Sequence, residues 1–435
     1  MFSKILIANR GEIAVRIIRA CKEMGVATVA VYSEADRNSL HVAMADESFC
    51  LGPAASEESY LHQHRIVTAA LLSGAQAIHP GYGFLSENAH FAGLCSRNGL
   101  MFIGPSAERM EALSDKAGLK ALMAGAGLPV IPGTGILANV ELALLAAKEM
   151  GYPVMLKARS GGGGRGIRLA NSPEELRAAY PQAVAEANAA FGDGAVYIEK
   201  YISPARHIEV QILADEAGNA VCLGERDCSL QRRNQKLIEE TPSPTVSAGQ
   251  REKLMRMCAE AAKKIGYVGA GTMEFLLDAN GNFWFMEMNV RLQVEHCVTE
   301  MLTHIDLVKW QIRIAAGIPL SFKQEDVNLS GAAIECRVNA RACGKLTALH
   351  IPGGPDVRFD TFLTPDTQVV PWYDSLLGKL VTCAATRDEA LRKMRAALCE
   401  LVIEGVPTNV AEQLELTGDE RFARGEYDLK FMEGR

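Results

Sequence analysis

The chain has 435 residues, 48% of them hydrophobic and 22% charged, and its formal net charge is −7 at pH 7. The length predicts about two to four domains, the negative charge argues against a general nucleic-acid-binding protein, and no apolar run is long enough to cross a bilayer. The N-terminus has no secretory signal pattern, and 11 cysteines without a CxxC pair predict reduced thiols in the cytoplasm rather than a zinc ribbon.

Residues 1–105 alternate between patterns of strand and helix. We expect strands at 5–8, 27–32, 48–52, 77–81 and 100–104, and helices at 12–24, 60–72 and 86–97. Such alternation predicts a Rossmann-like, doubly wound parallel sheet. Open sheets of this kind bind ligands beyond the carboxyl ends of their strands, so the loop at 9–11 and the HPGYGF segment at 79–84 are candidate binding loops.

From 106 to about 135 the pattern is helical with glycine interruptions, and a second α/β unit follows. We expect strands at 151–158, 167–170, 195–202, 207–215, 219–226 and 332–340, and helices at 173–188, 247–265, 298–316 and 387–401. This order predicts a multidomain protein of the α/β and α+β classes.

A glycine-rich loop, GGGGRG at 161–166, joins two of these strands. It formally contains GxGxxG, but a dinucleotide site requires a helix after the loop, and here the strand-like IRLA follows. A strand–loop–strand arrangement suits a flap that closes over nucleotide phosphates, to which Lys157 could add positive charge. The structural alternative is a mobile surface hairpin. The EKYI run at 199–202 ends a later strand and could bind adenine and ribose.

The segment ERDCSLQRRNQK at 225–236 contains three arginines and a lysine. On a chain of negative net charge, this pattern indicates a focused anion site, in which Gln231 and Lys236 could face a small anion. The structural alternative is internal ion pairing with Glu239 and Glu240.

The segment GTMEFLLDANGNFWFMEMN at 271–289 predicts a β-hairpin. An Asn-Gly pair at 280–281 is typical of a two-residue type I′ turn, which would place Glu274 opposite Glu287. Like charges in such a pair, between apolar neighbours, require a compensating cation. We therefore expect Glu274, Glu287 and the amide of Asn289 to hold Mg²⁺ or Mn²⁺. The alternative is an ordinary hairpin with solvated carboxylates.

The run VRLQVEH follows this hairpin. Alternation along it predicts a polar and an apolar face, formed by Arg291, Gln293 and Glu295 and by Leu292 and Val294. Glu295 could act as a general base, with Arg291 holding the anion that it deprotonates. Arg337 lies in the apolar run AAIECRV. Because buried charges are normally paired, we expect it to face Glu295 or a developing oxyanion.

Together these motifs resemble those of the biotin carboxylases, a family of the ATP-grasp superfamily. The matching stretches extend over nearly the whole chain and include KILIANRGEIAVRIIRA, HPGYGFLSENAHFA, GGGGRGIR, ERDCSLQRR, GTMEFL, FMEMNVRLQVEH, AAIECRVNA and YDSLLGKL. The resemblance implies an N-terminal Rossmann-like α/β domain at 1–114, an ATP-grasp domain at 115–330 with its glycine-rich flap near 131–204, and a C-terminal mixed α/β domain at 331–435.

The resemblance also implies roles for individual residues. ATP would contact Lys116, Lys157, Gly163, Gly164, Glu199, Lys200, Ile202, His207, Gln231, Asn234, Glu274 and Glu287. Mg²⁺ or Mn²⁺ would be bound by Glu274, Glu287 and Asn289. Bicarbonate and biotin would be bound by Lys236, Arg291, Gln293, Val294 and Arg337. Glu295 would deprotonate bicarbonate, with Arg291, Arg337 and Lys236 as the other catalytic residues, and Arg337 would stabilise the biotin enolate.

The implied reaction is the ATP- and bicarbonate-dependent carboxylation of biotin through carboxyphosphate. No Ala-Met-Lys-Met-like biotinylation sequence is present, so the biotin carboxyl carrier protein and the carboxyltransferase are expected to be separate chains. We expect a cytoplasmic homodimer with no nucleic-acid or membrane partner, serving acetyl-CoA carboxylase in fatty-acid biosynthesis. The alternatives are another acyl-CoA carboxylase, a ligase that joins a carboxylate to an amine, and a non-catalytic ATP-binding scaffold.

Three features depart from the family pattern. Asn234 stands where a histidine is usual, and Arg159 replaces a small residue in the flap. The sequence after Arg337 is several residues shorter than usual, with Arg341 at a position that is usually acidic. The shortening lies near the expected biotin pocket, so it could alter partner docking or rate.

Overall fold

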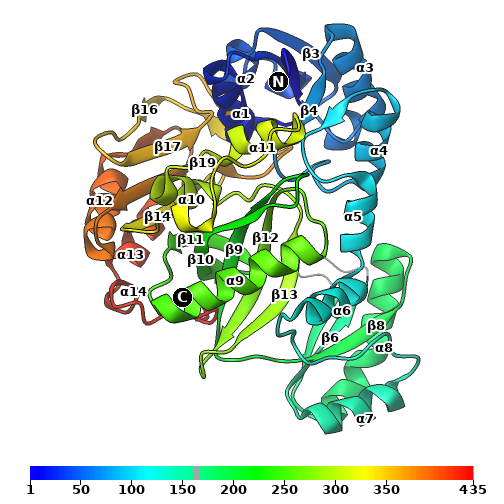
Figure 1. Ribbon diagram of the computed structural model, residues 1–435. Helices are drawn as coiled ribbons and strands as arrows, with labels where there is room; N and C mark the ends of the chain where they lie inside the picture. The colour runs from blue at the N-terminus through cyan, green and yellow to red at the C-terminus, as the bar shows by residue number, and fades with distance from the viewer. Residues whose placement is uncertain (160–165, 435) are drawn as a thin grey trace.

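The computed structural model describes residues 1–159 and 166–434, apart from the side chains at 116, 117 and 191. Its N-terminal part is a parallel sheet, as predicted, and the strand order is β3-β2-β1-β4-β5 (Figure 1). The strands are β1 (Lys4–Ile7), β2 (Ala27–Ser33), β3 (Glu47–Gly52), β4 (Ala77–His79) and β5 (Met101–Phe102). The helices are α1 (Gly11–Glu23), α2 (Leu40–Met44), α3 (Gln63–Ser73) and α4 (Ala89–Arg97).

Strand β1 shows why this sheet is covered on both faces. Leu6 packs into one buried apolar cluster, whereas its neighbours Ile5 and Ile7 pack into another. Successive side chains of a strand point to opposite faces, so apolar helices have to cover both sides of a strand that is apolar throughout. The chain leaves this buried strand at its carboxyl end, next to the loop that carries Asn9 and Arg10.

A smaller antiparallel sheet, in the order β7-β6-β8, lies at the edge of the molecule (Figure 1). It consists of β6 (Val154–Ala158), β7 (Ile167–Ala170) and β8 (Val196–Lys200), and packs against α7 (Val140–Met150) and α8 (Pro173–Phe191). Helix α7 was not expected from the sequence. Helices α5 (Ala107–Ser114) and α6 (Lys116–Ala126) lead into this part.

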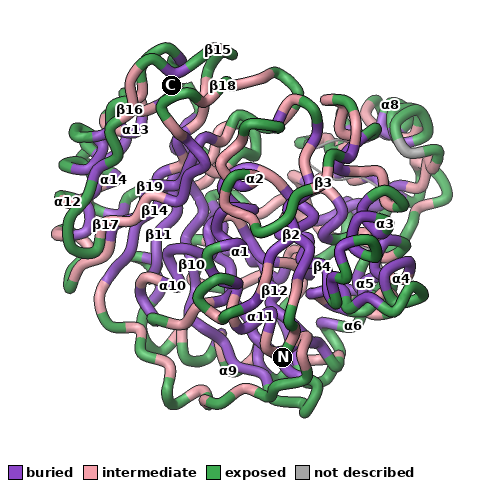
Figure 2. The backbone as a smooth tube through the Cα atoms, turned by 90° about the horizontal axis from the view of Figure 1, so that it is seen from above, coloured by how far each residue is buried: buried purple, intermediate pink, exposed green. Residues whose placement is uncertain are grey.

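The centre of the molecule is an antiparallel sheet in the order β13-β12-β9-β10-β11-β14-β19-β17. Its strands are β9 (Ala205–Ala214), β10 (Ala220–Arg232), β11 (Gln235–Thr241), β12 (Gly269–Asp278), β13 (Phe283–Asn289), β14 (Ala332–Asn339), β17 (Val357–Thr361) and β19 (Leu376–Ala384). Because β11 pairs with β14, the sheet continues without a break into the C-terminal part. In Figure 2 the buried stretches of β10, β11 and β12 run through the middle of the molecule.

The helices beside this sheet are α9 (Ala248–Lys264), α10 (His296–Thr303) and α11 (Leu307–Ala315). The single helix expected at 298–316 is therefore wrong. His304 takes a left-handed conformation with φ +57°, and Asp306 starts a new helix by accepting the backbone N–H of Lys309 at 2.8 Å. No helix in the part of the chain that the structure describes is both long and apolar enough to span a membrane.

Short elements complete the described chain. They are β15 (Gly344–Lys345), β16 (Ala348–His350), β18 (Gln368–Val369), β20 (Val402–Glu404), α12 (Arg387–Glu400), α13 (Val410–Gly418), α14 (Glu420–Ala423) and the 3₁₀ turns Glu34–Asp36, Ser56–Glu58 and Gln324–Asp326. Helices α12 and α13 pack with the C-terminal strands of the central sheet around a shared apolar core.

The hairpin of β12 and β13 places Glu274 opposite Glu287, as predicted, but by a different route. The two-residue turn is wrong, because Asn280 lacks the positive φ that a type I′ turn requires. Asp278 instead organises a longer loop, in which its Oδ1 accepts the backbone N–H of Asn280 at 2.9 Å. The longer loop shifts the strand pairing by one residue, and a β-bulge beside Glu274 restores the predicted register.

The register of the central sheet also sets charged residues in a row across neighbouring strands. Glu287 of β13 is opposite Glu274 of β12, Glu274 is opposite Glu209 of β9, and Glu209 is opposite Arg226 of β10. Glu209 and Arg226 are both fully buried and form an ion pair. Like charges directly opposite one another destabilise a sheet, so this row persists only if cations compensate its carboxylates.

Replacing Arg226 by methionine should therefore destabilise the protein strongly. Arg226 also donates to Gln211 at 2.8 Å and Thr299 at 3.0 Å, so its loss leaves several buried polar groups without a donor. We expect the free energy of unfolding to fall by about 3–5 kcal/mol, as measured by urea unfolding. Arg232→Met is the control, because the ion pair of Arg232 is 40% exposed on the arginine side and should contribute less than about 1 kcal/mol. Equal losses would contradict the compensation argument.

Candidate active site

A cleft of about 1520 Å³ lies where the N-terminal sheet, the small sheet β7-β6-β8, the central sheet and the C-terminal loops meet. The predicted site residues that line it are Lys157, Glu199, Lys200, Ile202, His207, Gln231, Asn234, Lys236, Glu274, Glu287, Asn289, Arg291, Gln293, Val294, Glu295 and Arg337. Lys116 begins α6, but its side chain lies outside the described residues, as do Gly163 and Gly164. The roles of these three residues stay predictions.

Glu274 is held as an anion by donors from three directions. Its Oε1 accepts from Asn289 Nδ2 at 2.7 Å and from Gln293 Nε2 at 3.1 Å, and its Oε2 lies 3.2 Å from His207 Nε2. Burial alone would raise the pKa of Glu274, but Lys236 and His207 pull it below its usual value. The carboxylate therefore stays charged although it is 4% exposed.

The β12–β13 pair offers a donor set that fits Mg²⁺ or Mn²⁺. Glu274 and Glu287 are directly opposite and both line the cleft, and Asn289 follows on the same side of β13. Asn289 donates its Nδ2 to Glu274, and its Oδ1 accepts from Arg291 at 3.3 Å, which leaves this oxygen a second lone pair for an ion. Two carboxylates and an amide oxygen are hard ligands of the kind these ions prefer.

Glu295 immediately precedes α10 and is 1% exposed. Its Oε1 accepts from Lys236 Nζ, and its Oε2 accepts from Arg337 at 2.9 Å. Burial alone would raise the pKa of Glu295, but Lys236 and Arg337 hold it well below its usual range. In this arrangement the carboxylate is a weak base, and a ligand that drew either cation away would strengthen it.

Arg337 faces Glu295, which was one of its two predicted partners. It extends from β14 and also donates its Nε to Glu239 Oε1 of β11 at 2.6 Å. One guanidinium thus bridges two buried carboxylates.

The chain after β13 is only partly extended. Arg291 donates to Gln293 Oε1 at 2.8 Å, so these side chains lie on the same side, as predicted. Leu292 is fully buried, whereas Val294 lines the cleft, so the predicted apolar face shared by these two residues is wrong. The reason is that the chain turns at Val294 and Glu295 into α10, which ends the strand alternation.

At the flap end of the cleft, Glu199 lies between two lysines. Lys157 Nζ is 2.6 Å from its Oε2, and Lys120 of α6 contacts its Oε1. Lys200 also lines the cleft, but its Nζ donates to a backbone carbonyl before β6 at 2.9 Å rather than to Glu199. Lys120 was not predicted, although it lies on the same helix, α6, four residues after the predicted Lys116.

The basic segment at 225–236 pairs with partners that were not expected. Arg226 binds Glu209, and Arg232 binds a glutamate of α13. Glu239 and Glu240, the partners in the alternative interpretation, bind arginines of the C-terminal part instead. That alternative is therefore wrong.

The turn between β10 and β11 accounts for Asn234. Arg233 and Asn234 have φ +51° and +65° and are the two residues between the paired Arg232 and Gln235. Asparagine tolerates a left-handed conformation better than most residues. The family pattern has histidine at this position. Asn234 adopts the left-handed conformation that the turn requires, and its exposed side chain lines the cleft.

The two arginines that depart from the family pattern, Arg159 and Arg341, form ion pairs near the surface. Arg159 lies 3.0 Å from Asp193, and Arg341 lies 2.7 Å from Glu412. Both arginines are about half exposed, so each pair contributes little to stability. Glu412 also binds Arg232, which links the shortened loop to the turn of the basic segment.

Sequence reasoning missed a buried group behind Val294. Lys379 of β19 is fully buried, donates to the carbonyl of Val294 at 2.9 Å and lies 3.1 Å from Glu12 Oε1. Tyr82 donates its hydroxyl to the same oxygen, and burial raises the pKa of Glu12 to about 7. A lysine inside the apolar run LLGKLVT was the available signal, since a buried charge needs a partner.

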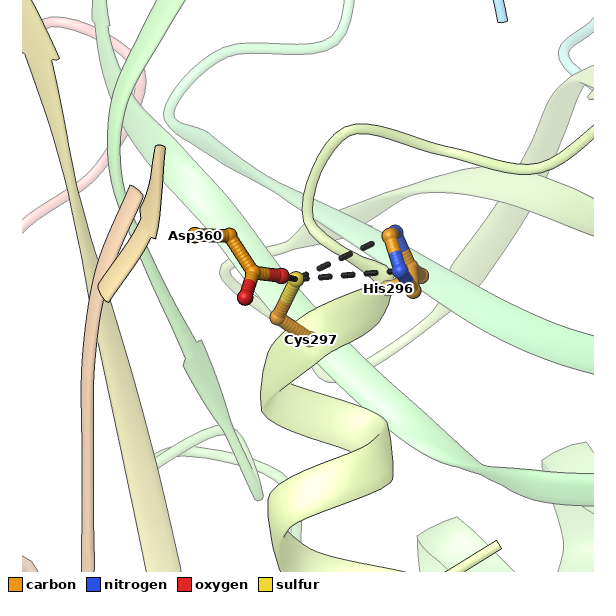
Figure 3. Close-up of side chains that lie close together, drawn as sticks. All are labelled: His296, Cys297 and Asp360. Carbon is orange, nitrogen blue, oxygen red and sulfur yellow. Dashed lines mark hydrogen bonds between the residues drawn. The ribbon is translucent and has the colours of Figure 1, made fainter. Parts of the chain in front are cut away.

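Figure 3 shows a second buried cluster at the start of α10, with His296 and Cys297 facing Asp360 of β17. Cys297 Sγ lies 3.1 Å from Asp360 Oδ2 and 3.7 Å from His296 Nε2, a spacing that a metal could use. Arg358, however, donates to both oxygens of Asp360, at 2.9 and 2.6 Å. Because the guanidinium of Arg358 already compensates the charge of Asp360, we interpret the cluster as a contact that holds the start of α10 against β17 and not as a metal centre.

Three family models match consecutive parts of the chain. They describe the biotin carboxylase N-terminal domain at residues 1–110, the carbamoyl-phosphate synthase L chain ATP-binding domain at 115–323, and the biotin carboxylase C-terminal domain at 335–434. Biotin carboxylase 1 of Bacillus subtilis is 52% identical over 443 residues, covering 100% of this chain and 98% of that protein. The biotin carboxylase of Nostoc sp. is 51% identical over 441 residues, covering 99% of each.

Solved structures agree with these matches. The biotin carboxylase–βγ-ATP complex from Campylobacter jejuni superimposes with a TM-score of 0.97 at 48% identity, covering 99% of this chain and 98% of that one. The biotin carboxylase domain dimer of the Hydrogenobacter thermophilus 2-oxoglutarate carboxylase, in complex with MgADP, ADP and bicarbonate, gives a TM-score of 0.95 at 49% identity, covering 100% and 97%. With the cleft described above, these similarities show that the chain belongs to the biotin carboxylase family.

Proposed function

We propose that this chain catalyses the ATP-dependent carboxylation of biotin by bicarbonate. The observation that carries the proposal is the buried Glu295, which lies between Lys236 and Arg337 in a cleft that also contains oxygen ligands for a divalent ion. A small anion held by these cations would lie beside a carboxylate that can accept its proton.

ATP binds at the flap end of the cleft in this proposal. The backbone at 199–202 holds the adenine, and Lys157 approaches the phosphates. Before ATP binds, Glu199 holds Lys157 and Lys120, so the phosphates have to compete with one buried carboxylate for two cations. The other residues proposed to contact ATP are Lys116, Gly163, Gly164, Lys200, Ile202, His207, Gln231, Asn234, Glu274 and Glu287.

Glu274, Glu287 and Asn289 would hold Mg²⁺ or Mn²⁺. When bound, the ion supplies positive charge to the phosphate oxygens during transfer. Lys236 and His207 lower the pKa of Glu274, so this carboxylate is already ionised when the ion binds.

Bicarbonate binds against Lys236, Arg291, Gln293 and the backbone of Val294. Its negative charge competes with Glu295 for Lys236, which restores the basicity of Glu295. Glu295 then takes the proton of bicarbonate, and the resulting carbonate attacks the γ-phosphate of ATP. The bond to the ADP oxygen breaks, and carboxyphosphate and ADP are formed. The bond between the carboxyl carbon and the phosphate oxygen of carboxyphosphate then breaks, the leaving phosphate takes up the proton of biotin N1, and the carboxyl group bonds to N1 while Arg337 stabilises the enolate oxygen.

The assembly around this cleft is also a proposal. We assign domains to 1–114, 115–330, with the flap at about 131–204, and 331–435. The biotin carboxyl carrier protein and the carboxyltransferase would be separate chains, the enzyme a cytoplasmic homodimer, and the acceptor system acetyl-CoA carboxylase. One solved relative is described as a domain dimer, and relatives from a 2-oxoglutarate carboxylase and a pyruvate carboxylase share the fold. The acceptor therefore depends on the partner chains rather than on this cleft.

Glu295→Gln should lower bicarbonate-dependent ADP release by about 100-fold or more, because an amide cannot accept the proton. ATP binding, measured by displacement of a fluorescent analogue, should change less than about twofold. Arg337→Met should remove the part of the turnover that free biotin stimulates.

Glu400→Gln, on the exposed side of α12, is the control for these variants and should behave as the wild type. Turnover that required an amine and no bicarbonate would replace the proposal with a carboxylate–amine ligase. ATP binding without turnover under any of these conditions would indicate a non-catalytic scaffold.

Removal of divalent ions with a chelator should abolish ADP release, and Mg²⁺ or Mn²⁺ should restore it. Glu287→Gln should raise the Mg²⁺ concentration needed for half-maximal rate by about tenfold or more, because one charged ligand is lost. The exposed Glu260→Gln serves as a control. An unchanged Mg²⁺ dependence in Glu287→Gln would show that the ion binds elsewhere.

A further inference from the structure

Two fully buried glutamates lie behind Arg337, and neither lines the cleft. Glu335 of β14 is directly opposite Glu239 of β11, and both are 0% exposed. Arg337 comes two residues after Glu335, so it extends from the same face of β14. Its guanidinium joins Glu239 to Glu295.

Most of the oxygens of this glutamate pair have no hydrogen-bond partner among the described residues. Both oxygens of Glu335 are buried without a donor, and so is Oε2 of Glu239. A buried acceptor without a donor is costly. Directly opposed side chains have Cβ atoms about 5 Å apart, so the two carboxyl groups can reach each other. Two ionised carboxylates would repel there, whereas one shared proton would satisfy an oxygen on each.

Among the residues that the structure describes, each cation around the pair is bound by other groups, and Lys236 is bound by Glu209 and Glu295. The charged or titratable groups that face it are Arg337 of β14, Lys236 of β11, Lys379 of β19, Cys228 of β10, Cys336 of β14, and Glu295 and Cys297 at the start of α10. Arg337 is bound by Glu239 and Glu295, and Lys379 by Glu12 and a backbone carbonyl.

Burial also favours the protonated form of this glutamate pair. It raises the pKa of Glu335 well above its usual value, and repulsion from Glu239 raises it further. Burial also raises the pKa of Glu239, although Arg337 opposes that rise. The proton therefore belongs on Glu335 and the charge on Glu239.

We propose that Glu335 is a protonated carboxyl group that donates its O–H to Glu239 and that this pair positions Arg337. With the donor on Oε2, Glu239 keeps its negative charge and its Oε1 for the arginine. Arg337 is then shared between Glu239 and Glu295 instead of neutralising Glu295 alone, which leaves Glu295 more basic. The inference rests on the proposed role of Arg337 in the reaction, and Glu335 acts as a positioning residue because it does not touch the substrates.

Glu335→Gln tests the protonation without any need for turnover. Glutamine is neutral, has nearly the same size and keeps an N–H donor for Glu239. In the wild type, Glu335 keeps its proton when folded and releases it on unfolding at any pH above its ordinary value of 4.5, so the free energy of unfolding should fall as the pH rises. Glu335→Gln lacks this pH-dependent loss. The difference between the melting temperature of Glu335→Gln and that of the wild type should therefore become more positive from about pH 5 to about pH 7.

Glu300→Gln is the matched control for this measurement. Glu300 of α10 is 7% exposed, but Arg16 and Arg358 pair with it. Burial opposes these two cations, which nevertheless lower the pKa of Glu300 to about 2. It is ionised in both folded and unfolded chains above about pH 5. Its replacement should lower the melting temperature by an amount that stays constant over the same pH range.

Kinetics separate a positioning role from a packing role. Glu335→Gln should keep kcat for bicarbonate-dependent ADP release within about twofold, because the donor is retained. Glu335→Met removes the donor and should lower kcat about tenfold with an unchanged KM for ATP. Equal losses in the two variants would overturn the proposal, and so would a melting-temperature difference that did not depend on pH. Failure of the proposed function would instead appear as a wild type without bicarbonate-dependent turnover, and would leave the melting result unaffected.

Discussion

The ammonium group of Lys236 lies among three carboxylates that come from three different parts of the chain, and the geometry of the cleft depends on it. Its Nζ is 2.8 Å from Glu209 of β9 and 3.5 Å from Glu274 of β12, and it contacts Glu295 before α10. Burial would lower the pKa of Lys236, but Glu209 and Glu295 raise it well above its usual value. A permanent cation therefore fixes the general base and one metal ligand relative to each other.

The same principle extends across the central sheet from β9 to β17. Arg226 compensates Glu209, Arg337 joins Glu295 to Glu239, and Arg358 compensates Asp360. Each cation is bound by carboxylates before any substrate arrives. Of these cations, Lys236 and Arg337 line the cleft, so an anion in the proposed mechanism binds them by exchange and increases the basicity of Glu295.

Local patterns in the sequence were enough to predict the parallel sheet and the strands β6 and β7, whereas the predicted facing of Glu274 and Glu287 is correct only because a β-bulge offsets the longer loop. Exact turns were less predictable, because a neighbouring side chain that binds the loop backbone can outweigh the preference of the turn residues. The Asn-Gly pair at 280–281 did not form the expected turn, since Asp278 bound the loop instead. The two-residue turn with positive φ occurs at Arg233 and Asn234, which carry no glycine signal.

The residues behind the cleft could not be predicted for a different reason. Glu209, Lys379 and Glu335 look like ordinary members of strands, and only the order of strands in the sheet shows which charges meet. Lys379 is 85 residues from the Val294 carbonyl that it binds. A buried charge in an apolar run indicates that a partner exists, but it does not identify the partner.

In the proposed mechanism, bicarbonate is the nucleophile that attacks the γ-phosphate, and Glu295 prepares it by removing a proton. Turnover of ATP with ¹⁸O-labelled bicarbonate and biotin tests this step directly, with the released phosphate analysed by mass spectrometry. Each phosphate should carry one oxygen from bicarbonate, because that oxygen stays on phosphorus when carboxyphosphate gives up its carbon. Phosphate without this label would show that water attacks ATP, and would contradict a role for Glu295 in activating bicarbonate.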